Sequence, residues 1–150
     1  MDKSDFLWKM VEENYTQVRQ HETMRASISN IIIVLSGALL VFSSKDGVNK
    51  SDIPAFLFIA ALGLFGALFS LKHYERARHH GKIGSQIRKK LAKEINAEQI
   101  IEESAKEAMS MDSPFYMKFI KLVRLHFFWM FLHLFISLLG AGLSVYVIIK

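Results

Sequence analysis

Three long stretches without Asp, Glu, Lys or Arg constrain what this chain can fold into. They cover residues 26–44, 53–71 and 125–149. A helix rises about 1.5 Å per residue, so each stretch reaches about 28 Å or more, close to the hydrocarbon thickness of a bilayer. The longest of the remaining segments, residues 72–124, is too short for a large soluble enzyme domain. The sequence therefore predicts an all-α integral membrane protein with three transmembrane helices.

The basic residues between these stretches predict how the chain is oriented. Lys and Arg number four in residues 1–25, two in 45–52, twelve in 72–124 and one at Lys150. Positive charge marks the cytoplasmic side of a multi-pass protein. The amino end (1–25) and the middle segment (72–124) are therefore expected inside, with loop 45–52 and the carboxyl end outside. The middle segment would contact anionic lipid of the bilayer on the cytoplasmic side.

The composition argues against several classes of function. The chain has no cysteine, which excludes disulfides, thiolate catalysis and cysteine-ligated zinc. The basic stretch 72–93 holds Tyr74 but no series of aromatic residues for base stacking, so nucleic acid is not an expected partner. His21-Glu22 is not a metalloprotease motif, because Arg25 stands where the second histidine ligand belongs. No phosphate-binding loop or nucleophile elbow is present, and we expect no enzyme activity, cofactor or metal.

Helix signals also occur outside the three spans. Residues 1–25 set apolar side chains on one face and contain no breaker, which predicts an amphipathic helix that continues into the first span. Loop 45–52 makes the first two spans an antiparallel hairpin. The second span should continue past residue 72 as a helix, either unbroken or interrupted near Gly81 or Gly84. Asn96 with Gln99 resembles a capping box that starts a helix over 98–110.

The last helix has a start signal upstream of its span. Ser113-Pro114 predicts its first turn, and Phe115, Phe119 and Val123 would make the following turns amphipathic.

An apolar seam follows the second span. Its side chains recur every four residues and so share one helix face that needs a partner. We interpret this face as an oligomer seam made by Ile83, Ile87, Leu91 and Ile95.

Small residues four apart occur in the second and third spans. Helices associate in lipid through close packing at such residues. They either pack the three helices of one chain together or serve contacts between copies. The candidates are Gly63 with Ala67, Gly66 with Ser70, Ser137 with Ala141, and Gly140 with Ser144.

Two histidines share a face of the third span because they are seven residues apart. An imidazole inside a membrane needs a partner. His126 and His133 could form interhelical hydrogen bonds or could line a hydrated pore whose conductance responds to protonation.

Polar residues cluster where the first span begins and the second ends. If these spans are antiparallel, facing residues have numbers that add to about 97. Glu22 would then approach Glu75 or Arg76, and Arg19 would approach Arg78 or Glu75. The cluster could clamp the hairpin or bind a phosphate or nucleotide. Its members are Tyr15, Arg19, His21, Glu22, Arg25, Asn30, His73, Glu75, Arg76 and His80.

Two short patterns carry a resemblance to known proteins. They are Tyr15-x-x-x-Arg19-x-His21-Glu22-x-x-Arg25-x-x-x-x-Asn30 and Lys72-His73-Tyr74-Glu75-Arg76-x-x-x-His80. Over residues 10–95 the chain resembles the RipA-type small octameric membrane proteins of bacteria and the related hairpin membrane effectors of antiphage systems. The resemblance implies a ring-like homo-oligomer, an octamer, gated from the cytoplasm by a sensor or defence protein. The two-span effectors have both ends inside, whereas a third span here places the carboxyl end outside.

Together, the sequence and the resemblance predict a homo-oligomeric, pore-like or effector protein of the inner membrane. Its cytoplasmic helices would gate it or recruit it, in antiphage defence. The alternative is a membrane scaffold that conducts nothing and anchors a cytoplasmic partner on the apolar seam defined above.

Overall fold

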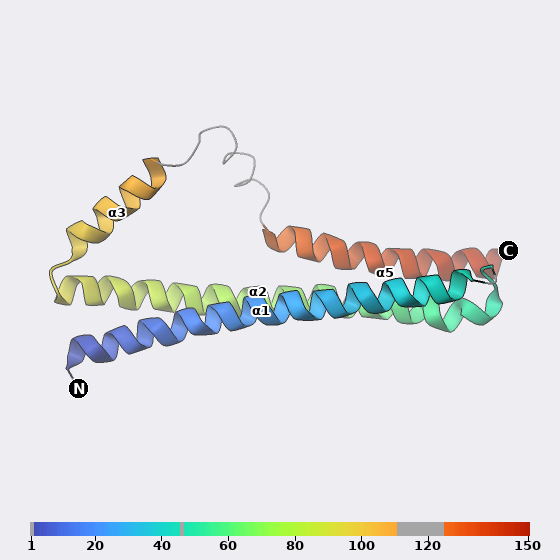
Figure 1. The fold of residues 1–150 in the computed structure, drawn as a ribbon, viewed down its shortest axis with the longest axis horizontal. Coiled ribbons are helices and arrows are strands. Elements are labelled where there is room, and N and C mark those ends of the chain that lie inside the picture. Colours follow the sequence, from blue (N-terminus) through green and yellow to red (C-terminus); the bar gives the residue numbers. More distant parts are fainter. Residues whose placement is uncertain (1, 46, 111–124) are drawn as a thin grey trace. The chain divides into compact units, whose positions relative to one another are not determined.

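The computed structural model describes residues 2–45, 47–110 and 125–150, and the regular structure in these ranges is helical, with no strand (Figure 1). The elements are α1 (Lys3–Ser44), the short 3-10 helix η1 (Lys50–Asp52), α2 (Ile53–Glu94), α3 (Glu98–Ser110) and α5 (Leu125–Ile149). The predicted all-α class is confirmed. The predicted start of the last helix, at Ser113-Pro114 with its amphipathic turns, lies outside the described residues.

Within the described residues, three helices are long and apolar enough to cross a membrane: α1, α2 with η1, and α5. The first two have 42 residues each, or about 63 Å at 1.5 Å per residue. This is about twice the hydrocarbon thickness of a bilayer. Each of these helices therefore holds one span and one extension, as the unbroken apolar and amphipathic patterns predicted.

The connection between α1 and α2 contains more structure than the predicted loop. The Asn49 side chain accepts a hydrogen bond from the Ser51 N–H at 2.9 Å, and the Asp52 carboxylate accepts one from the Asn49 N–H at 2.9 Å. This reciprocal capping starts η1, and α2 follows at once. Pro54 fits the first turn of α2, where a helix needs no N–H donor.

The α2 helix runs through Gly81 and Gly84 without interruption and ends at Glu94. Asn96 then has a positive φ of 53°, the Asn96 N–H bonds to the Lys93 carbonyl, and the Ala97 N–H bonds to the Ala92 carbonyl at 2.8 Å. These bonds form a Schellman motif. The prediction of α3 over 98–110 is confirmed, but Asn96 ends the preceding helix and does not cap the following one. Asparagine tolerates the left-handed conformation that this terminus requires.

The chain divides into two compact units. Unit 1 contains residues 1–22 and 75–124, and unit 2 contains residues 23–74 and 125–150.

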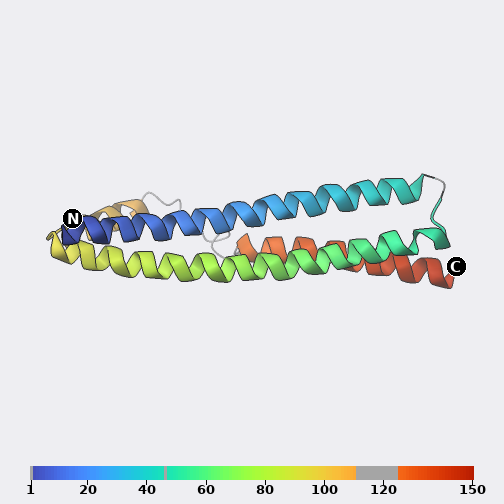
Figure 2. The same cartoon turned by 90° about the horizontal axis from the view of Figure 1, so that it is seen from below.

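In unit 1, the start of α1 lies antiparallel beside the end of α2 (Figure 2). Lys3 Nζ lies 2.8 Å from Glu94 Oε2, and the space beside Gly81 is closed by the Val18 side chain. The numbers of these paired residues add to about 97–99, as expected for an antiparallel hairpin with a short loop. The predicted register is therefore confirmed.

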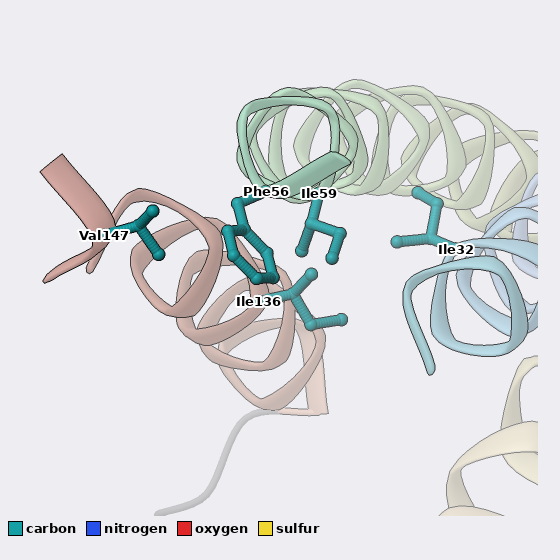
Figure 3. Close-up of a cluster of buried hydrophobic side chains, with 5 residues drawn as sticks. All are labelled: Ile32, Phe56, Ile59, Ile136 and Val147. Carbon is teal, nitrogen blue, oxygen red and sulfur yellow. The ribbon is translucent and has the colours of Figure 1, made fainter. Parts of the chain in front are cut away.

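In unit 2, α1, α2 and α5 enclose a small apolar core (Figure 3). Gly66 faces Ile32 of α1, so α1 and α2 are also antiparallel neighbours within this unit. Large apolar side chains such as Phe42 (76% exposed) and Leu138 (71% exposed) lie on the outside, where lipid would cover them. The core consists of Ile32, Phe56, Ile59, Ile136 and Val147.

The ion pair between Lys3 and Glu94 is expected to contribute little to stability. The two side chains are 69% and 43% exposed, so water and salt screen the attraction. Replacing Glu94 with glutamine should lower the free energy of unfolding by at most about 1 kcal/mol, as measured by thermal unfolding in detergent at low salt. A loss several times larger would mean that this contact holds unit 1 together.

Candidate functional site

A hydrogen bond inside unit 2 joins α1 to α5. Ser29 Oγ lies 2.8 Å from Nε2 of His133, and each of these residues is 1% exposed. The sequence predicted that His133 needs a partner but did not identify Ser29. Of the two alternatives for His133, an interhelical hydrogen bond or the lining of a hydrated pore, the structure shows the hydrogen bond. The His133 side chain lies in the interior of unit 2.

Gly66 provides the space that the His133 ring occupies. A Cβ atom at position 66 would collide with Nδ1 and Cε1 of that ring and would lie 2.7 Å from Cδ1 of Ile32. Any larger residue at position 66 would therefore displace the histidine or separate the helices. Both Gly66 and His133 were predicted site residues, but their contact with each other was not predicted.

The helices α2 and α5 cross at two further glycines. A Cβ at Gly140 would lie 2.5 Å from the Phe56 carbonyl oxygen and from the Ala60 N, and a Cβ at Gly63 would collide with the backbone of Ser137. The Ser137 hydroxyl donates a hydrogen bond to the Ala60 carbonyl at 2.9 Å. These predicted packing residues thus bring together helices of one chain, which was the intramolecular alternative.

The other small residues predicted for helix packing are also mostly buried. Ala67 is 6% exposed, Ser70 2% and Ser144 3%, while Ala141 is exposed. The Ser144 hydroxyl donates to the Gly140 carbonyl in its own helix at 2.9 Å.

A line of buried serines on α1 was missed by the sequence analysis. Ser29, Ser36 and Ser43 are seven residues apart and at most 4% exposed. The hydroxyls of Ser36 and Ser43 lack a hydrogen-bond partner among the described residues, as does Nδ1 of His133. Their seven-residue spacing was the sequence signal for a shared buried face, since residues seven apart lie on the same side of a helix.

Two polar residues of α1 near Ser29 differ in exposure: Arg25 lies one turn before Ser29, and Asn30 directly follows it. Arg25 is only 7% exposed, and its Nε has no hydrogen-bond partner among the residues that the structure describes. Asn30 is exposed and lines a shallow, mostly apolar groove. The other residues of this groove are Ile31, Val34, Leu35 and Ala38.

Stacked rings lie in the last α2 residues that belong to unit 2 and at the start of α5. The Tyr74 ring stacks on His126 at 4.0 Å between centroids with an interplanar angle of 12°. The His73 ring stacks on Phe69 of its own helix at 4.1 Å. His126 is half-buried, so both predicted histidines of the third span contact other side chains of the unit.

Unit 1 holds the rest of the predicted polar cluster. Nδ1 of His80 lies 3.1 Å from Oδ1 of Asn14, and the His80 ring stacks on His21 at 5.8 Å. Arg19 donates to the Thr16 hydroxyl at 3.0 Å. The sequence analysis missed Asn14, because nothing in its local pattern distinguishes it from a solvated polar residue.

The remaining predicted members of the cluster differ in exposure. Tyr15 is half-buried and packs against Gly84, whereas Glu22, Glu75 and Arg76 are exposed. The predicted approach of Glu22 to Glu75 or Arg76, and of Arg19 to Arg78 or Glu75, stays a prediction.

The four seam residues differ in exposure, and Ile95 lies just after the end of α2. Ile83 and Ile87 are half-buried, Leu91 is 7% exposed, and Ile95 is 54% exposed. The covered part of the seam lies within unit 1, and Ile95 is the part that a further partner could cover.

In the described part of the chain, no group of three His, Asp or Glu side chains is arranged to hold a metal ion.

The comparisons with known proteins assign no family. No protein-family model matches the chain, and no solved structure matches it. The chain is similar to the tetracycline resistance protein TetM from transposon Tn1545 of Enterococcus faecalis, with 27% identity over 99 residues. These residues are 66% of this chain but 16% of that protein, so the chain spans a small fraction of the relative's length.

Proposed function

We propose that this protein is a homo-oligomeric, pore-like or effector protein of the bacterial inner membrane. Its amino end and residues 72–124 lie in the cytoplasm, its carboxyl end lies outside, and the cytoplasmic helices gate it or recruit it. The excess of Lys and Arg in those segments supports the orientation. The resemblance to the RipA-type proteins and hairpin effectors supports a role in antiphage defence. In this role the protein forms an octamer that a cytoplasmic sensor gates.

The main observation that supports an oligomer is the exposed side-chain amide of Asn30. The residue lies within the apolar part of α1, and its neighbours in the groove are apolar. A side-chain amide has two donors and an acceptor that hydrocarbon cannot satisfy. A second copy of the chain, packed along this groove, would supply those partners.

The groove is also shaped for another helix. Asn30, Val34 and Ala38 are four residues apart and so form one ridge of α1. Ala38 is small, and nothing lies within 4 Å of a Cβ built at neighbouring Gly37. Small residues let two helices approach closely in lipid. This outer face is therefore the surface that we assign to contacts between copies.

Replacing Asn30 with leucine should weaken the oligomer. Interhelical hydrogen bonds in membranes contribute about 1–2 kcal/mol in model peptides, so each contact between copies should weaken about 10-fold. Native mass measurements in detergent would report the loss of oligomer, and leak from liposomes should fall in parallel. Asn30→Gln keeps the amide and should retain more of the oligomer than Asn30→Leu.

The matched control for this experiment is Ile33→Leu, an apolar exchange at a neighbouring exposed position of the same helix. This variant should assemble and leak as the unmodified protein does. A wild-type protein that is monomeric in several mild detergents would contradict the proposed oligomer. An oligomer that Asn30→Leu leaves intact would show that another face holds the copies together.

A second candidate function, the non-conducting scaffold, is favoured by exposed apolar side chains in unit 1. Phe6 is 48% exposed, Trp8 57%, Ile95 54% and Ile100 65%. These residues offer a partner protein an apolar surface. Conductance of liposomes that contain the purified protein separates the two functions, because the scaffold predicts no leak in any assembled state.

A further inference from the structure

The buried guanidinium of Arg25 marks a binding site that the oligomer proposed above does not explain. Arg25 lies one turn before Ser29 and two turns before Ile32, and these two residues are 1% and 2% exposed. Residues with this spacing share a helix face. The Arg25 side chain therefore points into the three-helix unit, and its own exposure of 7% agrees with this position.

The register of unit 2 identifies what lies opposite Arg25. Gly66 faces Ile32 on antiparallel helices, so the turn of α2 opposite Arg25 holds Lys72 and His73. Ser29 bonds to His133 on parallel helices, so the turn of α5 level with Arg25 holds Trp129, and His126 lies one turn before it.

The ring stack of Tyr74 and His126 lies at this same end of the unit. Basic and aromatic residues of α2 and α5 thus lie level with Arg25 along the unit.

Among the described residues of unit 2, no carboxylate lies at the Arg25 end of the helices. Asp52 of η1 is the carboxylate that the structure describes in this unit, and it lies at the other end of α1 and α2. Arg25 forms no ion pair with a residue that the structure describes, and its Nε lacks a hydrogen-bond partner there. A guanidinium stays charged in proteins, and an unpaired buried charge is costly. An anion at this position would therefore stabilise the folded chain.

We propose that Arg25 binds a phosphate group at the end of the three-helix unit, with Lys72 and His73 beside it. Phosphate oxygens match the planar fork of a guanidinium and accept two of its hydrogen bonds at once. The position, where the apolar span begins, suits the headgroup of an anionic phospholipid as well as a free phosphate compound. The inference does not depend on the oligomeric state.

The test is thermal unfolding of the full chain in a maltoside detergent, which contains no phosphate. Three additives are compared: dioctanoyl phosphatidylglycerol, dioctanoylglycerol, which has the same acyl chains without a phosphate, and inorganic phosphate. A ligand that binds the folded chain raises its midpoint of unfolding. A rise with the phospholipid alone identifies a lipid headgroup, and a rise with inorganic phosphate as well identifies a site for free phosphate.

The variants assign the effect to Arg25. Arg25→Gln should weaken binding by about 10-fold or more, because hydrogen bonds to a charged group are lost. Arg78→Gln, which removes an exposed guanidinium from α2, should leave the affinity unchanged. If Arg25→Gln does not fold, Arg25→Lys keeps the charge without the fork and should bind more weakly than the wild type.

Several results would overturn the site. One is the absence of a shift with either phosphate-containing additive. Another is an equal shift with dioctanoylglycerol, which would show that the acyl chains alone bind. A third is an affinity that neither Arg25→Gln nor Arg25→Lys reduces.

Discussion

Replacing Gly140 with valine is expected to lower the free energy of unfolding by about 3 kcal/mol, the upper part of the usual range for overpacking. The Cβ would lie 2.5 Å from the Phe56 carbonyl oxygen and from the Ala60 N. Both are backbone atoms, so no side chain can rotate to relieve the collision, and α2 and α5 would have to separate. Equilibrium unfolding of the purified protein in mixed micelles would measure the loss.

The matched control is Gly142→Val, because nothing lies within 4 Å of a Cβ built at Gly142. The same side chain is added to the same helix, two residues away, where lipid or detergent would accept it. We expect a change within about 0.5 kcal/mol, as for surface substitutions away from packed features. Equal losses for the two variants would contradict the close crossing of α2 and α5 at Gly140.

The parts of the fold that the sequence predicted depend on local signals. Apolar runs without charge or breaker determine where α1, α2 and α5 can cross a membrane, and the short connection makes the first two antiparallel. A short connection also sets the register, in which the numbers of facing residues add to about 97, as those of Lys3 and Glu94 do. Asn96 could not be assigned locally, because asparagine suits both a helix start and a left-handed helix end.

The contacts of the candidate site could be predicted less well, because they depend on how each helix is rotated about its axis. The sequence identified His133, Gly66 and Gly140 as residues that need a close neighbour. It could not show that Ser29 completes the hydrogen bond or that Gly66 makes room for the ring. Arg25 and Asn30 illustrate the same limit: both were predicted members of one polar cluster, yet one lies inside the unit and the other outside.

The second large effect is expected for His133→Ala, which should lower the free energy of unfolding by about 2–4 kcal/mol, within the range for buried large-to-small changes. The ring is 1% exposed and packs against Gly66, so its removal leaves a cavity and forfeits contacts that neighbouring atoms cannot restore. The Ser29 hydroxyl also loses its partner. The measurement is the same unfolding equilibrium in mixed micelles.

The control for the histidine is Phe135→Ala on the same helix, because Phe135 is 65% exposed and would be surrounded by lipid or detergent. Its removal exchanges one apolar contact for another and should cost much less than His133→Ala.

Ser29→Ala, alone and combined with His133→Ala, isolates the hydrogen bond in a double-mutant cycle, with an expected coupling of about 0.6–1.7 kcal/mol. A loss for His133→Ala no larger than that for Phe135→Ala would mean that the ring does not lie in the core. His133→Ala should destabilise the chain at both pH 6 and pH 8, because a buried structural histidine acts through packing. A histidine that lines a hydrated path would instead alter the pH dependence of leak without this loss of stability.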